Sequence, residues 1–193
     1  MEYLQLLGYF LILFIISYCI YTFYVKKDEV LKPSRLKSNF NILFLAYISA
    51  LASLTIIPSE RFSLNTTIDL TNYTPFLNTY KRYAMVTYFE NHLGIRMFWQ
   101  NFIGNIILFV PLGSFLLLLF RKRLRTTLLI AILTSASIEL TQLFFSLFGY
   151  YRFIDIDDVL LNTFGAFVGY TSTALFLKFF RYKFSLSLIA LRY

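Results

Sequence analysis

The sequence predicts an all-α fold, a polytopic integral membrane helix bundle of about five transmembrane helices. Hydrophobic residues make up 58% of the 193 residues and charged residues only 15%, which is more apolar than an ordinary soluble domain. Five segments approach the length of about 20 apolar residues that a helix needs to cross the hydrocarbon core. Basic residues gather between these segments in a pattern typical of membrane topology.

The predicted spans differ in how clearly they read as transmembrane helices. In chain order they are Leu4–Tyr24, Phe40–Ile57, Phe102–Phe120, Thr126–Phe148 and Val159–Phe180. The first has no basic region before it and exceeds the apolar core of a signal peptide, so we interpret it as a retained span. The third contains Pro111, which removes a backbone hydrogen bond and predicts a kink. The fifth is diluted by Gly165 and Gly169, whose spacing favours close helix packing.

One membrane domain with two peripheral segments is predicted. Residues 1–39 hold the first span and a basic loop, residues 40–180 form the membrane domain, and residues 181–193 form a short basic tail. The long connector Pro58–Asn101 contains the tyrosine-rich segment Phe76–Phe89, which is compatible with an interfacial helix on the outer membrane surface.

The positions of the basic residues predict the orientation in the membrane. Clusters in Val25–Asn39, in Arg121–Arg125 and in residues 178–192 fall on one side if five spans alternate. Positive-inside bias therefore predicts a multi-pass protein of the cell membrane with its amino terminus outside and its carboxyl terminus in the cytoplasm. Because the positive charge is explained by orientation, we expect membrane lipids rather than nucleic acid as partners.

Cysteine and histidine are too few for a thiolate or imidazole metal site. Cys19 and His92 are each the single residue of their type, so neither an intramolecular disulfide nor a zinc cluster is expected. We expect no metal and no cofactor.

Polar side chains recur on single faces of the predicted spans, since residues three or four apart share a helix face. The stripes are Asn101 and Asn105 in the third span, Ser135, Glu139, Gln142 and Ser146 in the fourth, and Asp158, Asn162, Gly165 and Gly169 in the fifth. At about 1.5 Å per residue, Asn105 and Asn162 would lie roughly 5 Å inside the outer ends of their spans. A carboxylate at the depth of Glu139 costs about 2.5–3.5 kcal/mol, which favours a functional role in a cavity open to the outside.

Each polar residue also has a purely structural interpretation. Asp155, Asp157 and Asp158 precede a predicted helix, where carboxylates cap free amides and favour the positive end of the dipole. Arg152 could form a solvated ion pair with these acids, which contributes little stability. Glu139 and the amide side chains of the stripes could instead join neighbouring helices by hydrogen bonds.

Four short motifs contain polar residues, three of them together with Pro or Gly. They are Asn72-Tyr73-Thr74-Pro75-Phe76, the span from Asn105 to Pro111-Leu112-Gly113, Ser137-Ile138-Glu139-Leu140-Thr141-Gln142, and the block of Arg152, Asp155, Asp158, Asn162 and Gly165. Together they resemble the motifs of VanZ-like membrane proteins. They occur in order between about residues 40 and 180, so the first span lies outside the resemblance. The family is named after an accessory protein of glycopeptide-resistance clusters that lowers susceptibility to teicoplanin, so the resemblance implies a role in the cell envelope.

The leading functional hypothesis is binding or handling of an amphiphilic envelope molecule in an outward-facing polar cavity. The ligand would be a lipid-linked precursor, a polyprenyl phosphate or a lipoglycopeptide. The predicted ligand-binding residues are Asn105, Glu139, Gln142, Arg152, Asp155, Asp158 and Asn162, and the predicted architectural residues are Pro75, Pro111, Gly113, Gly165 and Gly169. Arg152 would attract a phosphate or carboxylate, while Glu139 would serve as a protonatable group.

Two alternatives remain open on the sequence alone. An intramembrane enzyme could divide acid and base roles between Glu139 and an aspartate such as Asp158, with a divalent cation assisting. A non-catalytic partner subunit could assemble through the face that carries Gly165 and Gly169. A homo-oligomer is also possible.

Overall fold

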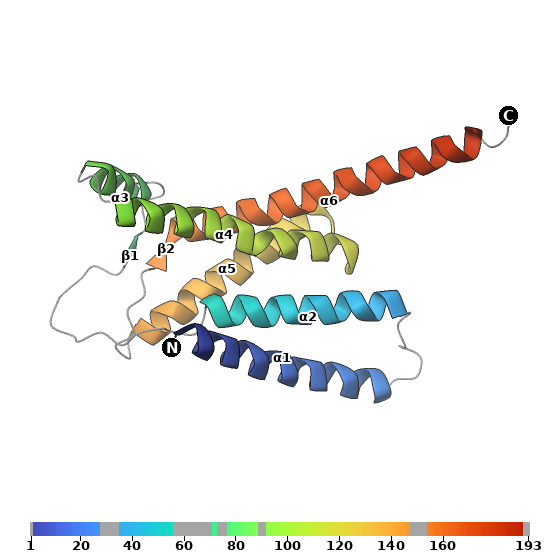
Figure 1. Ribbon diagram of the computed structural model, residues 1–193, viewed down its shortest axis with the longest axis horizontal. Coiled ribbons are helices and arrows are strands. Elements are labelled where there is room, and N and C mark those ends of the chain that lie inside the picture. Colours follow the sequence, from blue (N-terminus) through green and yellow to red (C-terminus); the bar gives the residue numbers. More distant parts are fainter. Residues whose placement is uncertain are drawn as a thin grey trace. The chain divides into compact units, whose positions relative to one another are not determined.

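The computed structural model describes residues 2–27, 35–55, 71–72, 77–88, 92–146 and 154–190. Within these ranges the elements are α1 (Glu2–Lys27), α2 (Arg35–Thr55), β1 (Thr71–Asn72), α3 (Leu77–Tyr88), α4 (His92–Leu118), α5 (Leu124–Ser146), β2 (Ile154–Asp155) and α6 (Ile156–Ala190) (Figure 1). The predicted all-α class is confirmed, with one short β-bridge added. The chain divides into two compact units, Met1–Tyr73 with Ala136–Ile156 and Thr74–Ser135 with Asp157–Tyr193.

Five of the described helices are long and apolar enough to cross a membrane. Their spanning segments are Gln5–Phe23, Lys37–Thr55, Gly94–Leu118, Leu124–Phe145 and Ile156–Phe180. Helix length and composition therefore confirm the predicted number of spans and the multi-pass architecture. The orientation of the two termini stays a prediction.

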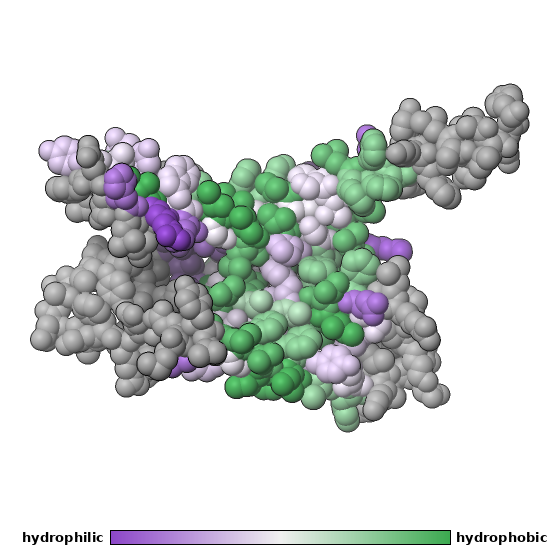
Figure 2. Space-filling view, viewed as in Figure 1, coloured by the Kyte–Doolittle hydropathy of each residue, from purple (hydrophilic) through white to green (hydrophobic). Residues whose placement is uncertain are grey.

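Large apolar side chains cover much of the exposed surface of these helices. Ile12 and Ile15 on α1 and Leu133 and Leu140 on α5 are all more than half exposed. Figure 2 shows the same property as broad green areas on the visible face. A surface of this kind is unfavourable in water and suits the hydrocarbon core of a bilayer.

In the first unit, α1 packs against α2 through small polar side chains. Ser17 Oγ lies 3.4 Å from Ser49 Oγ, and Ser49 also donates to Leu45 O at 2.8 Å. Tyr21 OH contacts Ser38 Oγ at 3.4 Å. Hydroxyls that satisfy a carbonyl of their own helix remain compatible with lipid and allow two helices to approach closely.

In the second unit, α4 and α6 approach each other backbone to backbone at three glycines. A Cβ atom on Gly113 would lie 2.0 Å from Ala166 O, one on Gly165 would lie 2.1 Å from Ile106 O, and one on Gly169 would lie 1.9 Å from Val110 O. No side chain fits at these distances, so close packing is the reason for glycine at all three positions. The close approach agrees with the interpretation of Gly165 and Gly169 as packing residues, and the architectural role of the three glycines stays a prediction.

Ser114, the residue after Gly113 on α4, joins the same two helices. Its Oγ lies 3.2 Å from both Val110 O and Gly169 O, and it accepts a hydrogen bond from Thr173 Oγ1 at 3.0 Å. α4 continues through Pro111 to Leu118, and the predicted kink at Pro111 stays a prediction.

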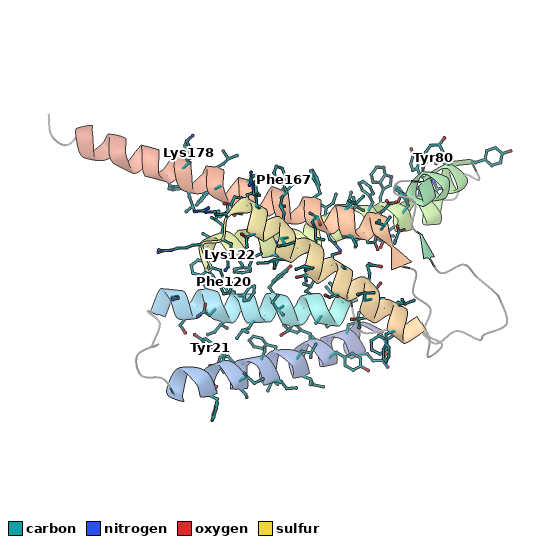
Figure 3. All side chains as sticks on the ribbon, turned by 180° about the vertical axis from the view of Figure 1, so that it is seen from behind. Tyr21, Tyr80, Phe120, Lys122, Phe167 and Lys178 are labelled. Atoms are coloured by element: carbon teal, nitrogen blue, oxygen red, sulfur yellow. The ribbon has the colours of Figure 1, made fainter. Side chains whose placement is uncertain are left out.

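The tyrosine-rich segment of the long connector forms a helix, α3, as predicted. The Tyr83 ring contacts the rings of Phe98 and Trp99 on α4, with centroids 5.4 Å and 6.4 Å apart. Tyr80, labelled in Figure 3, is 69% exposed. This aromatic surface is typical of the membrane–water boundary, but the interfacial position of α3 stays a prediction.

Two helix ends differ from the sequence prediction. α4 begins at His92, ten residues before the predicted start of the third span at Phe102, and α6 continues past Phe180 to Ala190. Hydropathy locates the stretch that suits lipid, whereas a helix continues as long as its backbone bonds are satisfied. The predicted boundaries of the domain and of the basic tail stay predictions.

Candidate functional site

Glu139 on α5 is buried in the first unit beside the start of α6. Its side chain is 5% exposed, and its Oε2 accepts a hydrogen bond from the backbone amide of Asp155 at 3.1 Å. Hydrogen bonds to carboxylates are among the stronger ones in proteins, because the acceptor is charged. The bond therefore fixes the mid-helix acid of α5 to the segment that leads into α6.

The β-bridge brings two of the sequence motifs together. β1 and β2 pair in parallel, with Thr71 opposite Ile154 and Asn72 opposite Asp155. Asn72 opens the motif of the long connector, and Asp155 belongs to the block before α6. Strands of two residues carry no periodic signal, so this pairing could not be predicted from the sequence.

Gln142 joins α5 to α2 in the first unit. It is buried, and its Nε2 donates to Thr55 O at 2.8 Å. Thr55 is the last residue of α2, so its carbonyl has no partner within the helix. Gln142 therefore has the structural role of satisfying a helix end, and nothing in the sequence marked Thr55 as its partner.

Two acids of the first turn of α6 are bonded by neighbouring helices of the second unit. Asp158 Oδ1 accepts a hydrogen bond from Asn105 Nδ2 on α4 at 2.6 Å. Asp157 Oδ2 accepts one from the hydroxyl of Thr79 on α3, and its side chain is 2% exposed. Negative charge is favoured at this helix end, so both acids position α3 and α4 relative to α6.

Asn162 lies one turn further along α6, on the same face as Asp158. It is 4% exposed, and its Nδ2 donates to the fully buried hydroxyl of Ser135 at 2.8 Å. Its Oδ1 has no hydrogen-bond partner among the described residues. A buried acceptor left in this state costs about 1–3 kcal/mol, so Asn162 stands out from the other amides of the stripes.

Asn105 lies further along its helix than the predicted span implied. The spanning segment of α4 begins at Gly94, about 16 Å before Asn105 along the helix axis, because α4 starts earlier than predicted. The predicted depth of Asn105 in the membrane stays a prediction. Asn105 is nevertheless level with the third residue of α6, because it bonds Asp158.

The structure also bears on the residues and alternatives that remain. Arg152 and Pro75 lie outside the described residues. The predicted ligand-binding role of Arg152 and the predicted architectural role of Pro75 therefore stay hypotheses. The face with Gly165 and Gly169 packs against α4 of the same chain, and assembly with a partner stays a prediction. Among the described residues, no group of three or more His, Cys, Asp or Glu side chains could hold a metal ion.

Thr79, Asp157 and Thr55 complete the observed contacts, although none was among the predicted site residues. Asp157 was recognised only as part of the acidic string before the last span. The prediction that the site residues line one outward-facing cavity stays a prediction.

A family model described as VanZ/LLP1 matches residues 44–178, which is more than half of the chain. The match begins in α2 and ends in α6. It includes the polar contacts of Glu139 and Gln142 in the first unit and those of Asn105, Asp158 and Asn162 in the second. Comparisons with curated proteins and with solved structures give no match.

Proposed function

This chain belongs to the VanZ/LLP1 family, and from that premise we propose that it binds or handles an amphiphilic molecule of the cell envelope. The ligand class comprises lipid-linked precursors, polyprenyl phosphates and lipoglycopeptides. The observation that carries the proposal is the burial of Glu139 and Asn162 within helices apolar enough to span a membrane. Polar and acidic groups are expensive at such positions and are retained there for a function.

Each cluster has a distinct part in the proposal. In the second unit, Asn105, Asp158 and Asn162 supply hydrogen-bonding groups for a polar head. In the first unit, Glu139 supplies a protonatable group, held by the amide of Asp155. Apolar helix surfaces next to such groups suit the acyl or prenyl chain of the same ligand.

The positions of charge along α4 and α6 support access from outside. Arg121, Lys122 and Arg123 follow the carboxyl end of α4 and are exposed, and Lys178 lies near the carboxyl end of the α6 spanning segment, whereas Asp158 lies in its first turn. Positive-inside bias assigns the basic residues to the cytoplasm, and Asp158 is then nearer the outer surface.

Labelling tests this orientation. A Lys122→Cys variant in a Cys19→Ser background should react with a membrane-impermeant maleimide only after the cells are opened. Reaction in intact cells would reverse the topology and remove the proposed outer access.

An enzyme is a second candidate, favoured by one contact. The Thr79 hydroxyl donates to Asp157, which is the arrangement that a nucleophilic hydroxyl and its base would need. The same contact also suffices to hold α3 on the first turn of α6. Product formation from a radiolabelled envelope lipid that is lost in Thr79→Val would favour the enzyme over the binding protein.

Lipid retention tests the binding proposal directly. The chain would be purified in a mild detergent, and bound amphiphiles would be identified by native mass spectrometry and by crosslinking with a photoreactive polyprenyl phosphate. Glu139→Gln should reduce both signals several-fold, while Leu140→Ala, which changes a neighbouring exposed side chain, should not. Equal retention by both variants, each monodisperse, would remove the main support for the proposal.

We also propose that the protein lowers susceptibility to teicoplanin-type drugs, because the resemblance to VanZ-like proteins points to that phenotype. A deletion strain would be scored across envelope-acting antibiotics and complemented with the wild type, Glu139→Gln or Asp158→Asn. Complementation by the wild type alone is the expected result. Unchanged susceptibility in the deletion strain would limit the function to lipid handling.

A further inference from the structure

Asn162 presents a buried acceptor that the described protein does not satisfy. Its Nδ2 donates a hydrogen bond to Ser135 Oγ at 2.8 Å, and Ser135 is itself fully buried. Its Oδ1 has no partner in the described part of the chain. Most buried polar atoms of native proteins are hydrogen-bonded, so this oxygen calls for a donor from outside the described residues.

A second acceptor lies near this oxygen on α6. Asp158 is one turn earlier on the same face of the helix, and its carboxyl group accepts hydrogen bonds, as it does from Asn105. The second requirement is therefore a further N–H or O–H donor for Asp158 on the same ligand group.

A primary ammonium group meets both requirements. It has three N–H donors and no acceptor, so one nitrogen can donate to Asn162 Oδ1 and to the Asp158 carboxylate. Side chains four residues apart on a helix have Cβ atoms about 5–6 Å apart, which two hydrogen bonds to one nitrogen can span. A phosphate offers only acceptors to the same two groups, and a quaternary ammonium offers charge without an N–H donor.

We propose that Asn162 and Asp158 form a subsite for the ammonium group of an amine-bearing amphiphile. This inference rests on the proposed function and narrows its ligand class from amphiphiles in general to those with a free primary amine. Asn105 is a positioning residue in this subsite, because its hydrogen bond orients the Asp158 carboxylate.

The test compares lipids that share acyl chains and differ only in the head group. Phosphatidylethanolamine, phosphatidylcholine and phosphatidic acid would be added to the purified chain, and the bound fraction would be measured by native mass spectrometry. We expect about fivefold preference for ethanolamine over choline, the size of one additional hydrogen bond. The preference should disappear in Asn162→Leu and fall in Asp158→Leu, because each variant removes an acceptor.

Matched variants separate recognition from folding. Thr163→Val is the control, because the Thr163 hydroxyl bonds Val159 O of its own helix at 2.7 Å, and it should keep the preference. Asn162→Asp retains the acceptor and should keep it too. If Asn162→Leu fails to fold, the preference of the wild type for ethanolamine over choline lipids still tests the ammonium subsite.

Three results would overturn the inference. Equal binding of ethanolamine and choline lipids, or a preference for phosphatidic acid, would exclude an ammonium subsite while leaving a Glu139-dependent binding protein intact. An Asn162→Leu variant that loses stability in every lipid yet keeps the preference would assign Asn162 to packing or hydration. If the wild type retains no amphiphile of any kind, the proposed function fails as well.

Discussion

Gly169 is the position at which the close packing of α4 and α6 can be tested by a single methyl group. A Cβ atom there would lie 1.9 Å from Val110 O and 2.8 Å from Val110 C. Both atoms belong to the backbone of α4, so no rotamer change can relieve the clash. Gly169→Ala must therefore separate the two helices or distort one of them.

The magnitude follows from that distance. To bring the contact from 1.9 Å to at least 3.0 Å, the helices must move apart by about 1.1 Å. Overpacking of a well-packed core costs about 1–3 kcal/mol, and a rigid backbone neighbour favours the upper end. Alanine regains about 1 kcal/mol of helix propensity relative to glycine. The expected net loss is about 2 kcal/mol.

Thermal stability in detergent is the measurement, scored as the fraction of monodisperse protein after heating. For a chain of this size the expected loss lowers the apparent midpoint by roughly 4–8 °C. Gly104→Ala is the matched control on α4, because a Cβ there meets nothing within 4 Å, and it should equal or exceed the wild type. If the two variants are equally stable, the backbones of α4 and α6 do not approach as closely as described.

Two further predictions concern the polar contacts. Asn105→Leu and Asp158→Leu should be non-additive in a double-mutant cycle of thermal stability, with a coupling of about 1–3 kcal/mol. Additive losses would mean that the 2.6 Å contact between Asn105 and Asp158 contributes nothing. Gln142→Leu should lower stability by about 1 kcal/mol, because the half-buried Thr55 carbonyl loses its donor. Thr141→Val, whose hydroxyl bonds within α5, should be nearly neutral, and equal effects of the two variants would refute this reasoning.

The spans could be predicted because a bilayer sets a length and a polarity that sequence alone reports. The predicted fourth span, Thr126–Phe148, overlaps α5 (Leu124–Ser146) almost completely. The start of α4 could not be predicted in the same way. Its first turns contain Arg96 and pack against the α3 ring of Tyr83 through Phe98, so tertiary contacts rather than hydropathy support them.

For the candidate site, too, local spacing could be predicted from the sequence and tertiary contacts could not. The polar faces of α5 and α6 follow from helical spacing, and Glu139, Gln142 and Asn162 are indeed buried. Their partners do not follow, because the pairing of side chains on different helices depends on how the helices are aligned along their length. Thr79 lies on α3, for which no polar face of helical spacing was predicted. Its bond to Asp157 could therefore not be predicted from the sequence.

The glycines and the polar residues of α6 form a single structural element with two consequences. Gly165 and Gly169 hold the backbone of α6 against α4, and this contact sets the alignment in which Asn105 meets Asp158. A shift of about 1 Å at the glycines would lengthen a 2.6 Å hydrogen bond beyond useful range. Loss of ligand binding in a glycine variant would therefore reflect a displaced Asp158, and the small residues act on the subsite by positioning it.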